Sequence, residues 1–532
     1  MNADGARHQL SHRQILVAFS GLLLGMLLGA LDQTVVATAL PTIVGELGGL
    51  SHLSWVVTAY LLASTVSIPL WGKMGDLYGR KRLFQVALAV FLTGSALCGI
   101  ADSIGQLIGF RALQGLGAGG LFTLAMATVG ELVVPRERGR YQGYIQAMFA
   151  LASVAGPLIG GSIVDHLSWR WLFYVNLPVG AVAFTVIGAT LRLPIQRQQR
   201  AIDYLGAGLM AAGLTCLLLM LVWVGSLYAW TSPEIVALLT ATLVLGAAFV
   251  LREQRAPEPV LPLALLRNAV VAISSAALFF STCSFFAAVV FLPLFVQLVR
   301  DETATNSGLL LLPMMLGATL SATSSGRLIS WTGRYKWFPV VGLALMAFTL
   351  MLFSQMGIAT APLTTGFVMA LFGLGFGMVG EVLILAVQNA VDRRELGTAT
   401  GTANLFRALG GSVGVSVYGS IFTGQLREWI SRLVPGDVAG GLDPNSLQAS
   451  PAMIRSLPDP VRDGLAQATA HALAPVFITA ALMAAGGLLV VLFLEERPLQ
   501  QADDGRSDER GHLGDAPPLE TTSTRRSTHV HP

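Results

Sequence analysis

Long uninterrupted apolar runs are the feature that most limits how this chain can fold. The run from Ile15 to Ala30 is one example, and similar runs recur along most of the 532 residues. A membrane-spanning α-helix takes about 20 consecutive apolar residues, whereas a membrane β-barrel shows alternating segments of about ten. Only 12% of the residues are charged, against about 25% in soluble domains. The sequence therefore predicts an all-α membrane protein.

Fourteen apolar segments are long enough to be candidate membrane helices. Their approximate spans are 15–41, 53–71, 83–101, 107–131, 141–164, 171–191, 204–225, 234–252, 269–298, 308–330, 337–356, 363–389, 398–423 and 472–495. At about 20 residues each they need about 280 residues, which the chain supplies with connections to spare.

Basic residues between the segments predict the orientation, because short cytoplasmic loops carry an excess of Lys and Arg. Every second connection is basic, whereas the alternate short loops hold only Arg170 and Arg300. The basic residues are Lys73, Arg80, Lys81, Arg82, Arg136, Arg138, Arg140, Arg192, Arg197, Arg200, Arg252, Arg255, Arg267, Arg334, Lys336, Arg393 and Arg394. This alternation favours an even number of helices with both termini in the cytoplasm.

An internal repeat divides the chain into two halves. Residues 72–80 read Gly, basic, five residues, Gly, Arg, and residues 326–334 repeat that pattern at the corresponding place in the last six segments. Parallel repeats of this kind are typical of transporters. The predicted organisation is a cytoplasmic N-terminus (1–14), a six-helix bundle (15–191), two accessory helices (192–268), a second six-helix bundle (269–495) with a long extracellular loop (424–471), and a disordered cytoplasmic tail (496–532).

Several classes of function are disfavoured by what the sequence lacks. A net charge of +3 indicates no nucleic-acid-binding surface. None of the three lysines stands in a Gly-Lys-Ser/Thr loop, which argues against an ATP-driven pump. The cysteines Cys98, Cys216 and Cys283 lie singly in apolar runs, a spacing that fits neither a metal site nor a disulfide framework. We expect no metal and no cofactor.

The segment 72–82 resembles the cytoplasmic signature of the major facilitator superfamily. Further stretches resemble motifs of its fourteen-helix drug:proton antiporters, the QacA/EmrB-like group: 31–41 in the first helix, 111–119 in the fourth, 156–161 in the fifth and 169–178 entering the sixth. The resemblance covers about residues 15 to 495 and implies a major facilitator fold with two six-helix bundles and two inserted helices. Ala152 and Ser330 depart from the pattern, where the motifs have Gly and an acid.

The resemblance also implies two sets of gating residues. A cytoplasmic gate, in which an ion-pair latch holds that side closed, would comprise Gly72, Lys73, Asp76, Gly79, Arg80 and Arg82. The antiporter motif, whose small residues allow close helix packing against leak, would comprise Gly143, Gly156, Pro157, Gly160 and Gly161. Simple positive-inside anchoring explains part of the first set.

Asp32 is the clearest candidate site in the first half. An acid inside a membrane helix costs about 2.5–3.5 kcal/mol on insertion scales, so it should face the bundle interior or a wet cavity. It could bind a proton or a cationic drug, or serve as a structural hydrogen-bond partner. Arg111, in the motif that the resemblance ties to proton coupling, would keep a nearby carboxylate ionised until substrate or conformation separates them.

Glu381 and Arg407 are the candidates in the second half. Glu381 lies deep in the repeat counterpart of the Arg111 helix, where a protonatable acid would suit a proton-coupled carrier; a buried neutral Glu is an equal alternative. Arg407 could pair with Glu381 or with substrate, and a structural pair is favoured.

The resulting prediction is a proton-coupled efflux transporter in the cell membrane that exports amphipathic or cationic organic molecules and works as a monomer. Its partners would be a small organic substrate, protons and the lipid bilayer. Alternatives are a dedicated exporter of one natural product, an uptake symporter, and an intramembrane enzyme. The Gly156-Pro157 motif argues against uptake, and the absence of any His central to an apolar segment argues against an enzyme.

Overall fold

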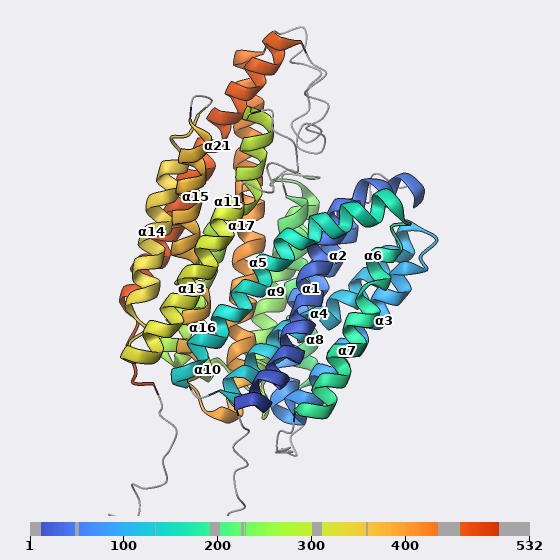
Figure 1. Ribbon diagram of the computed structural model, residues 1–532, viewed down its shortest axis with the longest axis vertical. Coiled ribbons are helices and arrows are strands. Elements are labelled where there is room, and N and C mark those ends of the chain that lie inside the picture. Colours follow the sequence, from blue (N-terminus) through green and yellow to red (C-terminus); the bar gives the residue numbers. More distant parts are fainter. Residues whose placement is uncertain are drawn as a thin grey trace, which may run out of the picture.

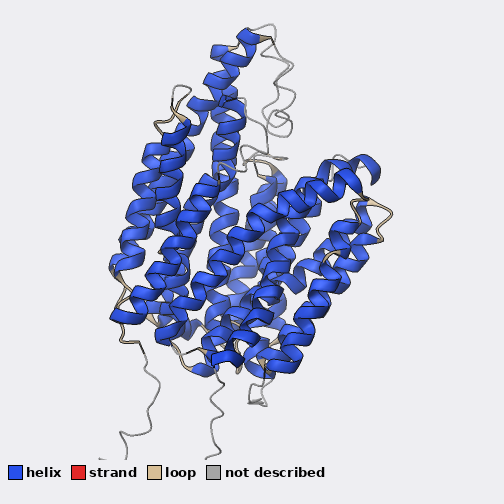
Figure 2. Ribbon diagram, viewed as in Figure 1, coloured by secondary structure: helices blue, strands red, loops and turns tan. Residues whose placement is uncertain are grey.

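The computed structural model describes residues 12–47, 53–133, 135–191, 203–224, 228, 230–300, 311–357, 360–434 and 458–499. In these ranges the chain is helical apart from short connections and one isolated β-bridge between Val224 and Tyr228, as Figure 2 shows. The prediction of an all-α protein is confirmed.

Eleven helical spans of the described residues are long and apolar enough to cross a membrane. They belong to α1 (His12–Leu47), α2 (Leu53–Tyr78), α3 (Arg80–Gly99), α4 (Ile104–Leu132), α6 with α7 (Trp171–Tyr174 and Asn176–Thr190), α8 (Tyr204–Trp223), α9 (Pro233–Glu253), α11 (Ala269–Arg300), α15 with α16 (Pro362–Gly377 and Gly380–Asn389), α17 (Leu396–Leu433) and α21 (Asp459–Leu492).

The other three expected segments fall on helices that are shorter or less apolar. Helix α14 (Trp337–Phe353) has 17 residues. Helix α5 (Pro135–His166) begins with charged residues, and α13 (Leu312–Thr332) carries a run of Ser, Thr and Gly. A total of fourteen membrane crossings therefore stays a prediction.

The helices form two groups that pack against each other (Figure 1). Helices α1 to α7 pack on one another, as do α11 to α21. Between the groups, α5 packs against α13 and α2 packs against α17. Helices α8 and α9 pair with each other, and α8 also contacts α2 and α17. We call the two groups the N-bundle and the C-bundle.

Several expected helix ends differ from the structure. Residues 424–433 and 459–471, expected in a long loop, continue α17 and α21, because few helix-breaking residues interrupt them; residues 435–457 lie outside the described part. Residues 497–499 are also described: the backbone N–H of Arg497 donates to the Tyr335 hydroxyl at 3.0 Å, and Asn389 donates to the Pro498 carbonyl at 3.2 Å. The expected tail from residue 500 and the N-terminal residues 1–11 lie outside the described residues.

Two glycines with positive φ mark the same place in each half. Gly79 has φ 91° between α2 and α3, and Gly333 has φ 72° after α13. A residue with a side chain rarely adopts this conformation, so glycine is needed at both turns. They occupy equivalent positions of the sequence repeat, which therefore places a positive-φ glycine at the end of α2 and at the end of α13.

Candidate functional site

Asp32 and Arg111 meet inside the N-bundle. Asp32 lies on α1 and Arg111 on α4, and Nη1 of Arg111 donates to Oδ2 of Asp32. Both side chains are almost completely buried. Nη1 also donates to Oε1 of Gln114 at 2.8 Å, and Nε donates to the Val56 carbonyl at 3.3 Å. The expectation that Arg111 stands beside a carboxylate agrees with this geometry.

Four neutral residues complete the surroundings of this pair. Gln114 and Asn176 donate to Oδ1 of Asp32 at 2.8 and 3.3 Å. Asn176 also donates to the Ser95 hydroxyl at 3.0 Å. The guanidinium lies over the Tyr60 ring, 4.2 Å from its centroid, in a cation–π contact. Both carboxylate oxygens therefore have donors, which is how buried charges are retained in proteins.

Glu381 and Arg407 form a looser pair in the C-bundle. Nη1 of Arg407 donates to Oε1 of Glu381 at 3.1 Å. Oε2 of Glu381 is buried and has no hydrogen-bond partner. The Arg407 side chain is 21% exposed, whereas Arg111 is 1% exposed. One half of this carboxylate therefore lacks the donors that a buried charge needs.

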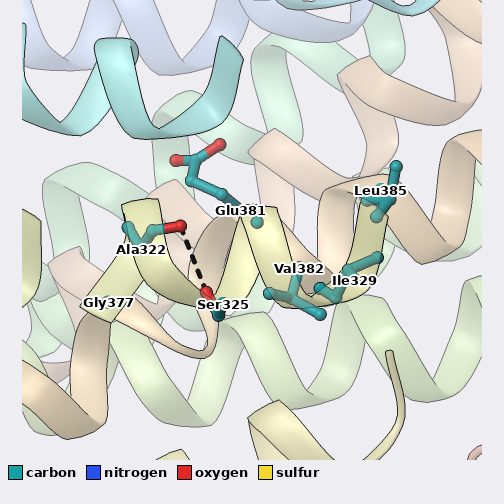
Figure 3. Close-up of a pocket in the computed structure, with 8 residues that line it drawn as sticks. Ala322, Ser325, Ile329, Gly377, Glu381, Val382 and Leu385 are labelled. Carbon is teal, nitrogen blue, oxygen red and sulfur yellow. Dashed lines mark hydrogen bonds between the residues drawn. The ribbon is translucent and has the colours of Figure 1, made fainter. Parts of the chain in front are cut away.

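The place of Glu381 in the fold is unusual. The expected helix 363–389 is broken into α15 and α16 between Gly377 and Gly380, and Glu381 stands in the first turn of α16. Figure 3 shows its carboxyl group pointing away from α16, toward the teal ribbon of α5 in the N-bundle. A chamber of about 10 Å³ adjoins it, lined by α13 and α15–α16, which is about the volume that one water molecule requires.

The cytoplasmic signature joins the two bundles through Asp76. Its Oδ1 accepts from the Gly397 backbone N–H at 2.9 Å, and its Oδ2 accepts from the Thr398 N–H and hydroxyl at 2.7 and 2.9 Å. These donors are the first turn of α17, where the helix dipole favours an anion. Arg80 donates to Asp76 and to Glu131, each at 2.7 Å.

The remaining signature residues divide between packing and other contacts. A Cβ on Gly72 would lie 2.6 Å from the Gly397 carbonyl oxygen, so only glycine lets α2 and α17 approach this closely. Lys73 pairs at 3.4 Å with Glu258, in the connection after α9, and Arg82 is exposed. Only Asp76 and Arg80 thus belong to the hydrogen-bonded latch.

The antiporter motif of α5 faces two different neighbours. A Cβ on Gly143 would lie 2.7 Å from Oγ1 of Thr323 on α13, in the C-bundle. A Cβ on Gly156 would lie 2.0 Å from Oγ1 of Thr34 on α1. Gly160 is buried, and a Cβ on Gly161 would meet nothing within 4 Å. Pro157 lies within α5, with its side chain outside the described residues.

Sequence reasoning missed several partners of these sites. Gln114, Asn176 and Ser95 are polar residues in apolar helices, and that signal could have marked them as buried hydrogen-bonding groups. The contact of Asp76 with the start of α17 joins residues more than 300 positions apart, and no local pattern points to it. In the described part of the chain, no three His, Cys, Asp or Glu side chains cluster as a metal site would require.

Comparisons with known proteins agree on one family. The sequence model of the Major Facilitator Superfamily matches residues 22–415. An uncharacterized MFS-type transporter of Mycobacterium tuberculosis is 38% identical over 499 residues, which are 94% of this chain and 72% of that protein. The multidrug transporter protein MdtP of Bacillus subtilis is 34% identical over 528 residues, covering 94% of this chain and 96% of its own.

A solved structure shows the same fold. The crystal structure of the human organic anion transporter MFSD10 superposes with a TM-score of 0.60 and 17% identity, covering 90% of this chain and 99% of its own. At that identity the likeness concerns the fold alone. Because the family model spans most of the sequence and the relatives align over nearly all of it, this chain belongs to the Major Facilitator Superfamily and is a multi-pass membrane transporter, not an enzyme.

Proposed function

We propose that the chain is a proton-coupled antiporter that exports amphipathic or cationic organic molecules. The observation that carries this proposal is Glu381: a buried acid, half-paired with Arg407, at a helix break that faces the other bundle. Broken helices often form the binding sites of transporters. The description of MdtP as a multidrug transporter supports the substrate class.

Coupling would come from competition at Glu381. When this carboxylate is ionised, it attracts Arg407 and a cationic substrate. When it takes a proton, the attraction is lost and the substrate is released. Exclusive binding is required, because a substrate that bound both protonation states equally would couple to nothing. The unpartnered Oε2 is the atom that we assign to the proton, since protonation removes the cost of burying an unpaired charge.

Asp32 and Arg111 have a different part in this proposal. Asp32 already accepts hydrogen bonds at both oxygens and is almost completely buried, so its charge is compensated within the N-bundle in this conformation. We assign the pair to holding the N-bundle rigid while the bundles rock. Direct drug binding by Asp32 would require the pair to separate, and the stability of Asp32→Asn, described below, tests the structural role.

The membrane arrangement is also part of the proposal. We place fourteen helices across the cell membrane of a monomer, with both termini in the cytoplasm and the Asp76 latch at the cytoplasmic face. A reporter fused after Leu191 or Arg267 should then be cytoplasmic, and a label near Gly441 should be reached only from outside. Labelling of positions 267 and 441 from the same side would contradict this topology.

The energy source is tested with purified protein in lipid vesicles. The probe is ethidium, a permanent organic cation, and the vesicles contain no ATP. An acid interior should drive ethidium inward, and an ionophore that dissipates the pH gradient should stop it. Uptake that ignores the gradient and follows added ATP would overturn the proposal. A panel with neutral dyes and antibiotics then separates a multidrug pump from an exporter of one natural product, which would move a single compound.

A further inference from the structure

Gln388 of α16 makes a hydrogen bond from the C-bundle to the N-bundle. Its Nε2 donates to the Met126 carbonyl of α4 at 3.1 Å and to the Thr400 hydroxyl of α17 at 3.2 Å. The side chain is almost completely buried. One amide group therefore contacts its own bundle and the opposite one.

Glycine at position 130 makes this contact possible. In α4 the Met126 carbonyl lies at the position whose helical partner is the N–H of residue 130, and its second lone pair is reachable only if residue 130 leaves room beside it. A Cβ on Gly130 would lie 2.9 Å from both Cδ and Oε1 of Gln388. The Gln388 amide thus occupies the space that a side chain on Gly130 would fill.

Met126 also contacts a second residue of the C-bundle. Nδ2 of Asn404 on α17 lies 3.8 Å from the Met126 sulfur, a weak polar contact. Two C-bundle amides therefore converge on a single residue of α4. Asn404 and Thr400 follow Gly397 and Thr398, the Asp76 partners, along the same helix.

We infer that Gln388, seated on Met126 and Gly130, is a second, uncharged latch that holds the bundles together and must open in each transport cycle. This inference rests on the rocking of two bundles assumed in the proposed function, and it makes Gln388 a positioning residue. The Asp76 latch uses a carboxylate, whereas this latch uses neutral groups alone, none of which titrates itself.

The latch is also connected to the proposed proton site. Glu381 and Gln388 stand seven residues apart on α16, which places them about two turns and about 10 Å apart on one face. A displacement of α16 that begins at Glu381 would reach Gln388 through continuous helix. Glu381 and the hydrogen bond from Gln388 to the N-bundle would therefore move together with α16.

The test compares substitutions on both sides of this contact. Gln388→Met keeps the side-chain length and removes the donor, and Gly130→Ala fills the amide's space. Gly109→Ala is the matched control, because a Cβ there meets nothing within 4 Å on the same helix. Spin labels on cysteines replacing the exposed Glu137 and Arg394, in a chain without its native cysteines, report the cytoplasmic separation of the bundles.

We expect Gln388→Met to raise the ratio of open to closed cytoplasmic distances about fivefold, which corresponds to about 1 kcal/mol at 1.4 kcal/mol per decade. Gly130→Ala should shift the ratio the same way, and Gly109→Ala should leave it unchanged. Wild-type distances in Gln388→Met would overturn the inference even if Gly130→Ala failed to fold. The distances are measured without substrate or pH gradient, so failure of the latch and failure of proton coupling are separate results.

Discussion

The two buried acid–arginine pairs differ in how completely they are satisfied. In the N-bundle, Asp32 has donors at both oxygens, and Arg111 is 1% exposed. In the C-bundle, Oε2 of Glu381 has no partner, and Arg407 is 21% exposed. A fully satisfied buried pair resists change, because removing one partner leaves an uncompensated charge. A half-satisfied acid can gain a proton or a cation, and this contrast is why we propose a structural role for the first pair and exchange for the second.

Neutralising each acid should produce the largest contrast. Asp32→Asn leaves Arg111 buried without a counter-charge, and breaking such a pair costs about 3–5 kcal/mol. Glu381→Gln leaves Arg407, whose side chain is 21% exposed, less completely buried than Arg111 and should cost less than Asp32→Asn. Thermal unfolding of both variants in detergent measures the difference. Equal losses of stability, or a larger loss for Glu381→Gln, would break the comparison.

The halves should also differ at the cytoplasmic gate. Asp76→Asn removes a charged acceptor of three α17 donors, and hydrogen bonds to charged groups contribute about 1.5–3 kcal/mol. Transport should fall about tenfold or more, with membrane insertion unchanged. The counterpart Ser330 is a neutral hydroxyl that donates to Gly326 at 2.9 Å, so Ser330→Ala removes no charge and, as the control, should lower transport less than Asp76→Asn. Transport rates in lipid vesicles measure this difference. Unchanged turnover in Asp76→Asn would mean that this loop serves only as positive-inside anchoring.

The close packing of α1 against α5 near Asp32 tests the rigidity of the N-bundle, with a smaller expected effect. Thr34, two residues after Asp32, donates to the Ala152 carbonyl at 3.2 Å and lies against Gly156. Gly156→Ala forces α1 and α5 apart, and overpacking of this kind costs about 1–3 kcal/mol. Gly161→Ala has open space around it and should unfold like the wild type. Identical unfolding temperatures for the two variants would show that α1 is not held tightly here.

The smallest expected effect is at the C-terminal end of α1. Hydrogen bonds from Arg170 and then Trp169 hold the pKa of Glu46 below its ordinary value of 4.5. A lowered pKa in the folded state stabilises the protein above the unfolded pKa, and that stability is lost as pH falls through the folded value. The unfolding temperatures of wild type and Glu46→Gln should differ slightly at neutral pH and converge below about pH 4.5. A difference in unfolding temperature that grows as the pH falls would contradict a lowered pKa of Glu46.

The general architecture could be predicted from the sequence, whereas most partners could not. Apolar runs indicate helices directly. The sequence repeat places a glycine at equivalent positions, Gly79 and Gly333, and both have a positive φ. The pairing of Glu381 with Arg407 was one of two expected outcomes for Arg407. The break before Glu381 was not expected, because residues 363–389 read as one apolar run.

Partners that are distant in the sequence depend on tertiary register. Asn176 lies 144 positions from Asp32, and Gln388 lies 262 positions from Met126. Each contact requires two helices to be placed to within about one turn, which local periodicity does not determine. Glu131 likewise lies 51 positions from its partner Arg80.

Proton-driven accumulation by Glu381→Gln tests the central claim most directly. For exchange of one proton against one monovalent cation, a pH difference of about one unit sustains about tenfold accumulation. Wild-type protein in vesicles should approach that ratio for ethidium. Glu381→Gln has the neutral side chain of the releasing state, so it should bind ethidium more weakly, exchange labelled for unlabelled ethidium only at higher concentration, and keep an accumulation ratio near one. Accumulation by Glu381→Gln at the wild-type ratio would contradict the assignment of the proton to this residue.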